Sequence, residues 1–313
     1  MKIEARWLSQ KGTRTDDNRD HAGIAGRHGE FLAIVADGAT TGSNNGGYAR
    51  AIVEAVVDWF AGTDDAWGHE LIQAKLREIH QALRKTFPRG SASIILFHVT
   101  DKGSLTVLHS GDCLLGRHDG QVHWQVKPHT LANALADMPL DAIARSTTRH
   151  LLTQSFRSRE FMAPDVLAEK KASGTFLLAT DGFWAELTES EQEAFLGGGQ
   201  STAPERDDRS VLQLRLSAEA PSEILLEDGG STNFTCGLRP PRNNPGAITH
   251  GIRDNLWATR CRIFQTSSLA TKQESELPSI ELSQRRALIF LLSWSSPRSI
   301  PRCFSSASQA RPR

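Results

Sequence analysis

The chain has 313 residues, of which 39% are hydrophobic, enough to build a sizeable buried core. Thirty-six Lys and Arg balance 36 Asp and Glu, so the formal net charge is zero. Without a global positive field the chain is not expected to bind nucleic acid or an anionic membrane.

The N-terminal segment and the cysteines exclude further classes. Residues 1–7 lack the apolar core of a signal peptide, and no window approaches the roughly 18 apolar residues of a membrane helix. We therefore expect a cytoplasmic protein. The four Cys show no CxxC pair and no zinc spacing, which indicates neither a disulfide framework nor a thiolate metal site.

The first third of the chain alternates predicted strands and helices. Residues 3–9 and 31–36 are predicted strands. Residues 47–61 and 70–87 place their apolar side chains on one helical face each. Two amphipathic helices in succession favour an antiparallel pair laid across a sheet.

The middle of the chain predicts a β-meander. Four strands are expected at 93–100, 104–109, 113–118 and 121–126, separated by Asp101-Lys-Gly, Ser110-Gly-Asp and Asp119-Gly120. Two less regular segments, 130–140 and 141–156, are helical or loop candidates. A strand at 175–180, a helix near 189–196 and a strand at 210–216 complete the pattern, which is typical of an α+β fold with largely antiparallel sheets.

The sequence changes character after Leu216. Residues 217–313 are rich in Ser, Pro, Arg and Asn and lack sustained periodicity except at 287–292. We therefore expect a domain at 1–216 followed by a low-order C-terminal tail at 217–313, either disordered or an aberrant extension. A small accessory module is the alternative.

Two apolar runs end in Asp-Gly, at Asp37-Gly38 and at Asp181-Gly182, and a helix-like stretch follows each. Asp-Gly usually marks a hairpin, as expected at Asp119-Gly120 between two strands. Taken singly, an Asp after a strand is most often a cap for the following helix. Taken together, the two units deliver carboxylates from the tips of buried strands.

Several further carboxylates lie near predicted loop edges: Asp16, Asp17, Asp20, Asp112, Asp207 and Asp208. Converging carboxylates without His or Cys partners repel one another unless a cation neutralises them. Oxygen ligands select hard ions such as Mg²⁺ or Mn²⁺. Two such ions roughly 3.5–4 Å apart commonly hydrolyse phosphate esters, so a metal-assisted phosphohydrolase is the resulting hypothesis.

The motifs, taken in order, resemble the PPM/PP2C family of metal-dependent protein serine/threonine phosphatases of the bacterial type. The resemblance covers residues 1 to about 216 and rests on Gly12-Thr-Arg14, Asn18-Arg-Asp20, Val35-Ala-Asp-Gly38, Gly90-Ser-Ala-Ser-Ile94, Ser110-Gly-Asp112, Leu178-Ala-Thr-Asp-Gly-Phe-Trp184 and Asp207-Asp-Arg-Ser-Val211. It implies a four-layer α/β/β/α sandwich of two antiparallel sheets flanked by helix pairs. It also implies a phosphoric monoester hydrolase that acts on phosphorylated proteins from a Ser/Thr kinase pathway.

The resemblance also implies roles for individual residues. Two Mn²⁺ or Mg²⁺ ions would be held by Asp37, the Gly38 carbonyl, Asp181 and Asp207. A third ion, seen in bacterial-type members, would lie between Asp112 and Asp181. Asp20 would lie in or just behind this ligand set, and Arg14 would bind the substrate phosphate. Phosphoserine or phosphothreonine would then be hydrolysed by a metal-bridging hydroxide.

Two departures from the family pattern support an alternative. Arg19 stands where the family usually has Glu or Gln, and Ala39-Thr-Thr-Gly42 replaces a glycine-rich stretch. The alternative is a weak or inactive pseudophosphatase that binds phosphoproteins or acts as a regulatory module. His129 and His150 are predicted to be surface or core-edge residues rather than catalysts.

Overall fold

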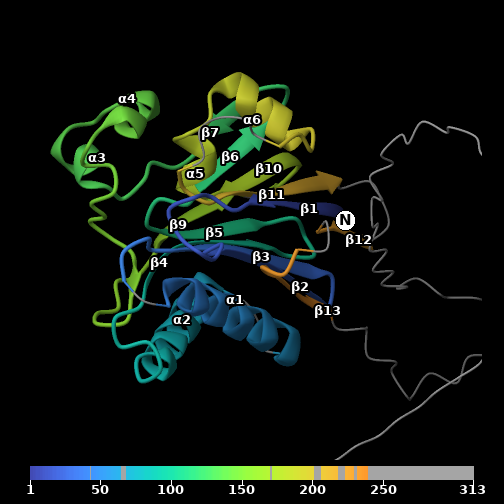
Figure 1. The fold of residues 1–313 in the computed structure, drawn as a ribbon. Coiled ribbons are helices and arrows are strands. Elements are labelled where there is room, and N and C mark those ends of the chain that lie inside the picture. The colour runs from blue at the N-terminus through green and yellow to red at the C-terminus, as the bar shows by residue number, and fades with distance from the viewer. Residues whose placement is uncertain are drawn as a thin grey trace, which may run out of the picture. The chain divides into compact units, whose positions relative to one another are not determined.

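The fold contains two stacked β-sheets (Figure 1). The computed structural model describes residues 1–42, 44–64, 68–169, 171–200, 206–217, 223–228 and 231–238. These residues all belong to one compact unit, Met1–Ser267.

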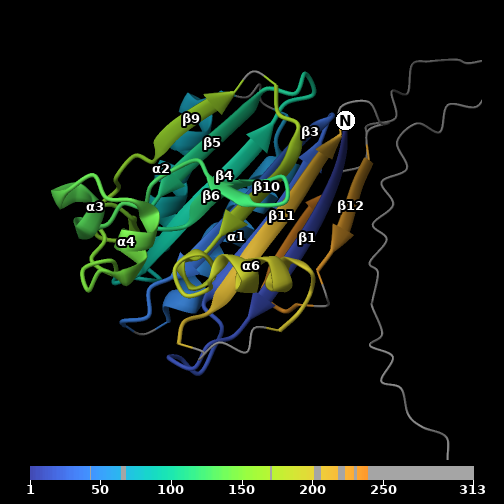
Figure 2. The same ribbon diagram turned by 90° about the horizontal axis from the view of Figure 1, so that it is seen from above.

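The first sheet, sheet A, has the strand order β12-β1-β11-β10-β6-β7. Its strands are β1 (Lys2–Gln10), β6 (Leu114–His118), β7 (Val122–Trp124), β10 (Gly174–Ala179), β11 (Arg209–Ser217) and β12 (Glu223–Glu227). Figure 2 shows β1, β11 and β10 side by side, with β12 at the sheet edge. All pairs are antiparallel except β1 with β12.

The second sheet, sheet B, has the order β13-β2-β3-β4-β5-β9, and a short strand β8 also pairs with β4. Its strands are β2 (Asp20–Arg27), β3 (Glu30–Gly38), β4 (Ser91–Val99), β5 (Leu105–Ser110), β8 (Phe156–Arg157), β9 (Asp165–Glu169) and β13 (Phe234–Leu238). Only the β2–β13 pair is parallel.

Both faces of strand β3 are buried, which explains its unbroken apolar run. Because side chains alternate along a strand, Phe31, Ala33 and Val35 belong to the core between the sheets. Leu32 and Ile34 instead belong to the core beneath the helices. An edge-to-face contact between Phe97 and Phe176, with ring centroids 5.1 Å apart, joins the two sheets.

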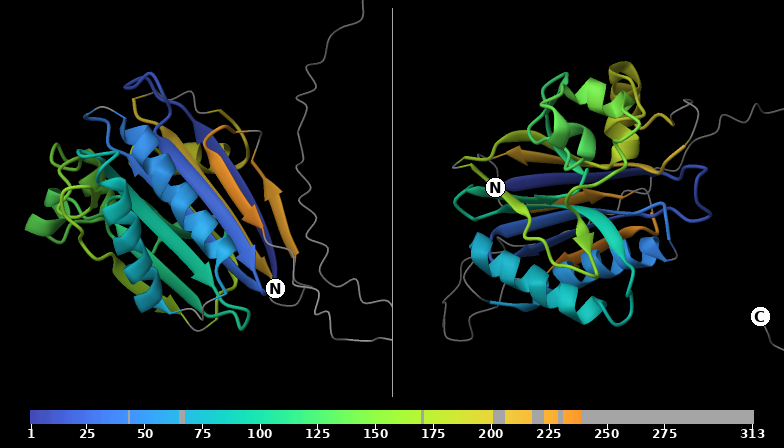
Figure 3. Two further views of the ribbon diagram at one scale, coloured as in Figure 1. Left: turned by 90° about the horizontal axis from the view of Figure 1, so that it is seen from below. Right: turned by 90° about the vertical axis from the view of Figure 1, so that its left-hand side faces the viewer.

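Helices cover the outer faces of both sheets. The blue and cyan helices α1 (Asn45–Gly62) and α2 (His69–Leu83) lie on sheet B, and the short α5 (Asp181–Trp184) and α6 (Glu189–Leu196) lie on sheet A (Figures 1 and 3). Two further short helices, α3 (Leu131–Leu135) and α4 (Leu140–Arg145), precede β8. The expected α+β fold with four α/β/β/α layers is thus confirmed. No helix in the described ranges is long and apolar enough to cross a bilayer.

The expected β-meander is wrong at its centre. The structure pairs β4 with β5 and β6 with β7, but β5 and β6 belong to different sheets. Ser110-Gly111-Asp112 therefore carries the chain from sheet B to sheet A, and Gly111 adopts a φ of +112° that favours glycine. The hairpin expected at Asp119-Gly120 is confirmed between β6 and β7, where Gly120 has a φ of +105°.

Part of the segment predicted as a low-order tail forms strands. β12 adds to the edge of sheet A beside β1, and β13 adds to the edge of sheet B beside β2. Between them, Asn233 donates to Ser9 Oγ at 2.9 Å and to the Asp20 carbonyl at 2.9 Å, so it bridges both sheets. Residues 239–313 of the predicted tail lie outside the described residues.

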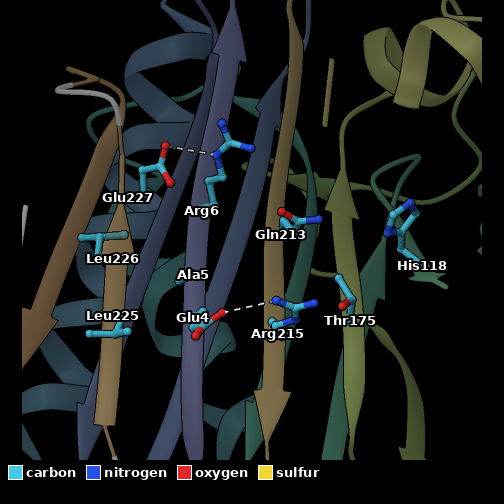
Figure 4. Close-up of a pocket in the computed structure, with 10 residues that line it drawn as sticks. All are labelled: Glu4, Ala5, Arg6, His118, Thr175, Gln213, Arg215, Leu225, Leu226 and Glu227. Atoms are coloured by element: carbon cyan, nitrogen blue, oxygen red, sulfur yellow. Dashed lines mark ion pairs between the residues drawn. The ribbon is translucent and has the colours of Figure 1, made fainter. Parts of the chain in front are cut away.

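The strand β12 also borders a groove on the outer face of sheet A (Figure 4). This groove has a volume of about 400 Å³. Its two arginines each face a carboxylate: Arg6 Nε lies 3.2 Å from Glu227 Oε1, and Arg215 Nη1 lies 3.8 Å from Glu4 Oε2. The charges that line this groove are therefore mutually neutralised.

Candidate active site

Carboxylates from both sheets meet at one end of the sandwich. Asp20 begins β2, Asp37 lies near the end of β3, and the strand register places these two residues opposite each other. On the sheet A side, Asp181 follows β10 and Asp207 precedes β11. Asp112 lies in the segment that crosses between the sheets. The alternating order of strand directions thus brings five distant acids to one edge.

A cleft of about 420 Å³ opens between these strand ends. Its lining includes four of the carboxylates and one predicted phosphate-binding residue: Asp37, Asp112, Asp181, Asp207 and Arg14. Asp20 is 1% exposed and lies behind the cleft wall. The sequence-predicted acids are thus brought together, with one of them out of reach of solvent.

The glycines of the two Asp-Gly units are required by close backbone approaches. A Cβ on Gly38 would lie 2.4 Å from the Asn45 carbonyl oxygen at the start of α1. A Cβ on Gly182 would lie 2.0 Å from the Asp208 carbonyl oxygen. Because each glycine lacks a Cβ, another backbone segment packs directly against it. This close packing constrains the backbone next to each aspartate.

Burial and the charges of nearby carboxylates raise the pKa values of Asp37 and Asp181. Burial raises the pKa of Asp37 well above its ordinary value, and the nearby charges of Asp20, Asp181, Asp112 and Asp207 raise it further. Burial also raises the pKa of Asp181, with Asp112 and Asp207 adding to the effect and Arg149 opposing it. The site therefore carries more negative charge than its surroundings neutralise.

Two arginines partly neutralise the sheet A side of the cluster. Arg14 Nη1 donates to Asp207 Oδ2 at 2.6 Å, and Arg149 Nη1 donates to Asp181 Oδ2 at 3.2 Å. The buried carboxylate of Glu186 lies 3.3 Å from Arg149 Nη2 and 3.7 Å from Arg14 Nη2. Glu186 thus holds both arginines in position beside the cleft.

The sheet B side lacks such compensation. Within the described residues no cation or hydrogen-bond donor contacts the carboxylate of Asp37, and Asp20 Oδ1 is buried without a partner. Oxygen donors with uncompensated negative charge suit a hard divalent cation such as Mg²⁺ or Mn²⁺. The donor set therefore fits metal binding, although no three His, Cys, Asp or Glu side chains in the described ranges form a preformed ion site.

Hydrogen bonds across the two sheets fix the buried part of the cluster. Thr180 Oγ1 donates to Asp20 Oδ2 at 2.9 Å, which links β10 to β2. Asp208 accepts from the backbone N–H groups of Gly12 at 2.8 Å and Arg19 at 2.7 Å. Asp208 thus fastens residues 12–19 to the segment that carries Asp207.

Arg19 binds the loop after β3 rather than the clustered carboxylates of the cleft. Its Nη1 donates to the carbonyls of Ala39 at 2.8 Å and Thr40 at 3.0 Å, and its Nε donates to Asp17 at 3.3 Å. Asn45 Nδ2 also donates to the Ala39 carbonyl at 2.8 Å and to the Thr41 carbonyl at 2.7 Å. The unusual Arg19 therefore stabilises the loop after β3, which is the loop that departs from the glycine-rich family pattern.

His129 clamps the crossing segment that carries Asp112. Its backbone N–H donates to the Gly111 carbonyl at 2.8 Å, and its Nδ1 accepts from the Gly111 N–H at 3.0 Å. Nε2 lies 3.1 Å from Asp165 Oδ2, which fixes the tautomer with the proton on Nε2. The side chain of His150 lies in the cleft lining, 46% exposed.

The sequence does not predict the roles of several residues that shape the site. Ser93 Oγ donates to Asp112 Oδ1 at 2.5 Å, and Ser93 belongs to the family-like segment Gly90-Ser-Ala-Ser-Ile94, for which the resemblance implies no role. Asp208 adjoins Asp207, and local sequence cannot separate their roles. Arg149 and Glu186 come from separate elements, so only the fold reveals their contact.

The sequence matches a known family, and the fold matches solved structures. The family model described as protein phosphatase 2C matches residues 9–215. None of the curated protein sequences matches this chain significantly.

Several bacterial phosphatase structures share the fold at low sequence identity. The serine/threonine phosphatase of S. agalactiae is 17% identical, with a TM-score of 0.58 over 69% of this chain and 100% of that chain. The serine/threonine phosphatase Stp1 from Staphylococcus aureus is 15% identical, with a TM-score of 0.57 over 68% and 95% of the two chains. The PPM Ser-Thr phosphatase from Mycobacterium smegmatis, in complex with cacodylate, is 22% identical, with a TM-score of 0.54 over 68% and 98%.

Proposed function

Because the chain belongs to the protein phosphatase 2C family, we propose that it hydrolyses phosphoserine and phosphothreonine on proteins in a metal-dependent reaction. The observation that carries this proposal is the convergence of five carboxylates from both sheets with too little positive charge to balance them. The substrate would be a phosphorylated protein from a Ser/Thr kinase pathway. A cytoplasmic location stays a prediction.

The ligands proposed for two divalent ions are Asp37, the Gly38 carbonyl, Asp181 and Asp207. Asp112 with Asp181 would hold a third ion, and Asp20 would orient the set from behind. Ions of the Mg²⁺ or Mn²⁺ type, when bound, would supply Lewis acidity and lower the pKa of the water that attacks phosphorus.

The chain's own residues position the ligands and the substrate. Ser93 holds Asp112, and Arg149, itself held by Glu186, holds Asp181. Arg14 is 30% exposed in the cleft, where its planar fork of donors suits a phosphate group. This fork donates to Asp207, and neutralisation of Asp207 by a bound cation would free it for the substrate.

The test is hydrolysis of a phosphothreonine peptide and of p-nitrophenyl phosphate with Mn²⁺, with Mg²⁺ and with EDTA. We expect turnover with either metal and none with EDTA. Asp181→Asn, which keeps the side-chain shape, should abolish turnover while the far-UV circular dichroism spectrum stays unchanged. Turnover in EDTA would contradict the metal-dependent reaction, and an active Asp181→Asn variant would contradict the ligand assignment.

The alternative is a module that binds phosphoproteins without turnover. The ion pairs of Arg14 with Asp207 and of Arg149 with Asp181 favour it, because they already neutralise part of the ligand set. Arg19, one of the two departures that supported this alternative, donates to the carbonyls of the loop after β3 and does not contact the clustered carboxylates. It therefore no longer favours an inactive protein. Binding of a phosphopeptide with no hydrolysis under any metal would support this alternative.

A further inference from the structure

A second cavity adjoins the catalytic cleft and is rich in cationic side chains. It has a volume of about 490 Å³, and its charged residues are Arg14, Arg145, Arg149, Arg206 and Glu186, with His150 also in the lining. Two of these residues, Arg14 and His150, also line the cleft. The two cavities therefore share a wall.

The charges at the buried wall of this basic cavity are close to balanced. Glu186 is its one carboxylate among the described lining residues, and three arginines already surround it: Arg149 at 3.3 Å, Arg14 at 3.7 Å and Arg209 at 3.8 Å. One carboxylate cannot neutralise three guanidinium groups. Arg14 and Arg149 also donate to the cleft carboxylates of Asp207 and Asp181. The positive and negative charges at the buried wall of the cavity are therefore close to balanced.

The outer rim of the basic cavity adds two arginines to this wall. Arg145 is 72% exposed, and its one partner among the described residues is Asp141, one turn earlier on the same helix. Such exposed pairs contribute little free energy and exchange partners easily. Arg206 is exposed, and no carboxylate among the described residues pairs with it. Both guanidinium groups can therefore accept an additional anionic partner.

The groove on the outer face of sheet A provides a contrast within the same molecule (Figure 4). There Arg6 and Arg215 are matched one to one by Glu227 and Glu4. The groove and the basic cavity have comparable volumes, about 400 and 490 Å³, but only the basic cavity carries surplus positive charge. The basic cavity also shares lining residues with the cleft, whereas the groove shares none in the part of the chain that the structure describes.

We propose that the basic cavity binds an acidic side chain of the phosphoprotein substrate, close in sequence to the phosphorylated residue. This inference rests on the proposed phosphatase function. The cleft and the basic cavity are adjacent, and an extended peptide advances about 3.3 Å per residue. We therefore expect the acidic residue about two or three positions from the phosphoresidue. Arg145 and Arg206 bind the carboxylate through paired N–H donors.

The test compares three phosphothreonine peptides that differ only at the flanking positions, which carry Glu, Gln or Lys. For the full chain with Mn²⁺ we expect kcat/KM about five- to tenfold higher for the Glu peptide than for the Gln peptide, mainly through KM. In the double variant Arg145→Gln, Arg206→Gln this ratio should fall close to one. The matched control is Arg215→Gln, which is 68% exposed in the groove of Figure 4 and should keep the wild-type ratio.

Binding of non-hydrolysable phosphonate analogues of the peptides, with Mn²⁺ present, separates failure of the cavity from failure of the phosphatase function. Fluorescence anisotropy of the labelled analogues, at low salt, should show the same Glu-over-Gln preference. Preferential binding of the analogues without hydrolysis of the parent peptides would support the cavity and contradict the phosphatase function. Equal dissociation constants for the Glu and Gln peptides, or an unchanged preference in the double variant, would overturn the cavity.

Free anions provide the last arm of the test. Inorganic phosphate and glutamate, added separately, should displace the Glu peptide only at concentrations far above that of the peptide, because the phosphothreonine anchors it in the cleft. If inorganic phosphate instead binds the wild type tightly, and not the double variant, while the peptides show no flank preference, the cavity is a free-anion site and the proposal is wrong.

Discussion

The carboxylate of Asp37 contacts no cation or donor among the described residues, and burial, together with the charges of four other carboxylates, raises its pKa. We expect Asp37→Asn to raise the free energy of unfolding in EDTA by about 1 kcal/mol or more, because it removes this repulsion. Urea unfolding measures the change. The same substitution should abolish hydrolysis with Mn²⁺, so stability and activity would change in opposite directions.

The control for this prediction is Asp58→Asn on the exposed face of α1, which should leave the free energy of unfolding within about 0.5 kcal/mol of wild type. An Asp37→Asn protein that is less stable than wild type in EDTA would mean that Asp37 has a stabilising partner. The mutual repulsion described above would then be wrong.

His109 is a buried neutral base whose effect appears in the pH dependence of stability. Burial lowers its pKa to about 3, and the neighbouring His129, stacked at 4.4 Å, lowers it further while Asp165 opposes the shift. The unfolded chain takes up this proton near pH 6.5, but the folded protein does not. Stability from this group is therefore complete above pH 6.5 and is lost as the pH falls below it.

Between pH 7 and pH 5 this loss amounts to about 2 kcal/mol, and His109→Gln should remove it. The measurement is the difference in unfolding free energy between the two pH values, for wild type and variant. Comparing these differences cancels the contribution of the site carboxylates, which both proteins share. Equal differences in the two proteins would show that His109 protonates in the folded state.

At the level of residues, the sequence predicts those side chains whose position follows from a strand end. Asp37 and Asp181 end apolar runs, so they had to lie at the edge of a sheet. Arg149 and Glu186 follow no such pattern, because their pairing depends on how α4 and α5 lie against sheet A. No local periodicity encodes that contact.

Among the elements, the residues just before β13 help to join the two sheets. Asn233 binds Ser9 of β1 and the Asp20 carbonyl of β2, and it accepts from Trp7 Nε1 at 3.2 Å. We expect Asn233→Ala to lower the free energy of unfolding by about 1–3 kcal/mol, because it leaves these groups without partners. Differential scanning calorimetry measures the change, with Gln121→Ala at the exposed hairpin turn as control.

Because Asn233 supports the strand that begins at Asp20, its loss should also weaken metal binding. Isothermal titration with Mn²⁺ would show a higher dissociation constant for Asn233→Ala than for Gln121→Ala. A variant with unchanged stability and unchanged Mn²⁺ affinity would mean that β12 and β13 are merely attached to the edges of the sheets.

The strands β2, β12 and β13 have weak sequence signals for two different reasons. β2 is wholly buried but reads Asp20-His-Ala-Gly-Ile-Ala-Gly-Arg27, and its small residues give little strand signal. Gly23 is needed there because a Cβ would lie 2.6 Å from Val53 Cγ1 of α1. β12 and β13 are five residues each and pair in parallel with distant strands, so neither periodicity nor a turn motif marks them. The long helices and apolar strands, in contrast, followed directly from their spacing.

Across the whole fold, the proposed metal ligands come from both sheets. Asp20 and Asp37 belong to sheet B, Asp181 and Asp207 adjoin strands of sheet A, and Asp112 lies in the crossing segment. A cation held by this set would connect layers that otherwise meet mainly through apolar side chains. Metal binding should therefore stabilise the sandwich as a unit rather than one loop.

We expect Mn²⁺ at about 100 times its dissociation constant to raise the free energy of unfolding by about 2.7 kcal/mol. Because ligands adjoin β3 and β10, amide hydrogen exchange should slow in both strands together, although they lie in different sheets. The Asp37→Asn protein should lose both effects. Slower exchange confined to β10 and its neighbours would place the ion on sheet A alone, bound by Asp181 and Asp207 without Asp37, and would remove the cross-sheet role proposed for the site.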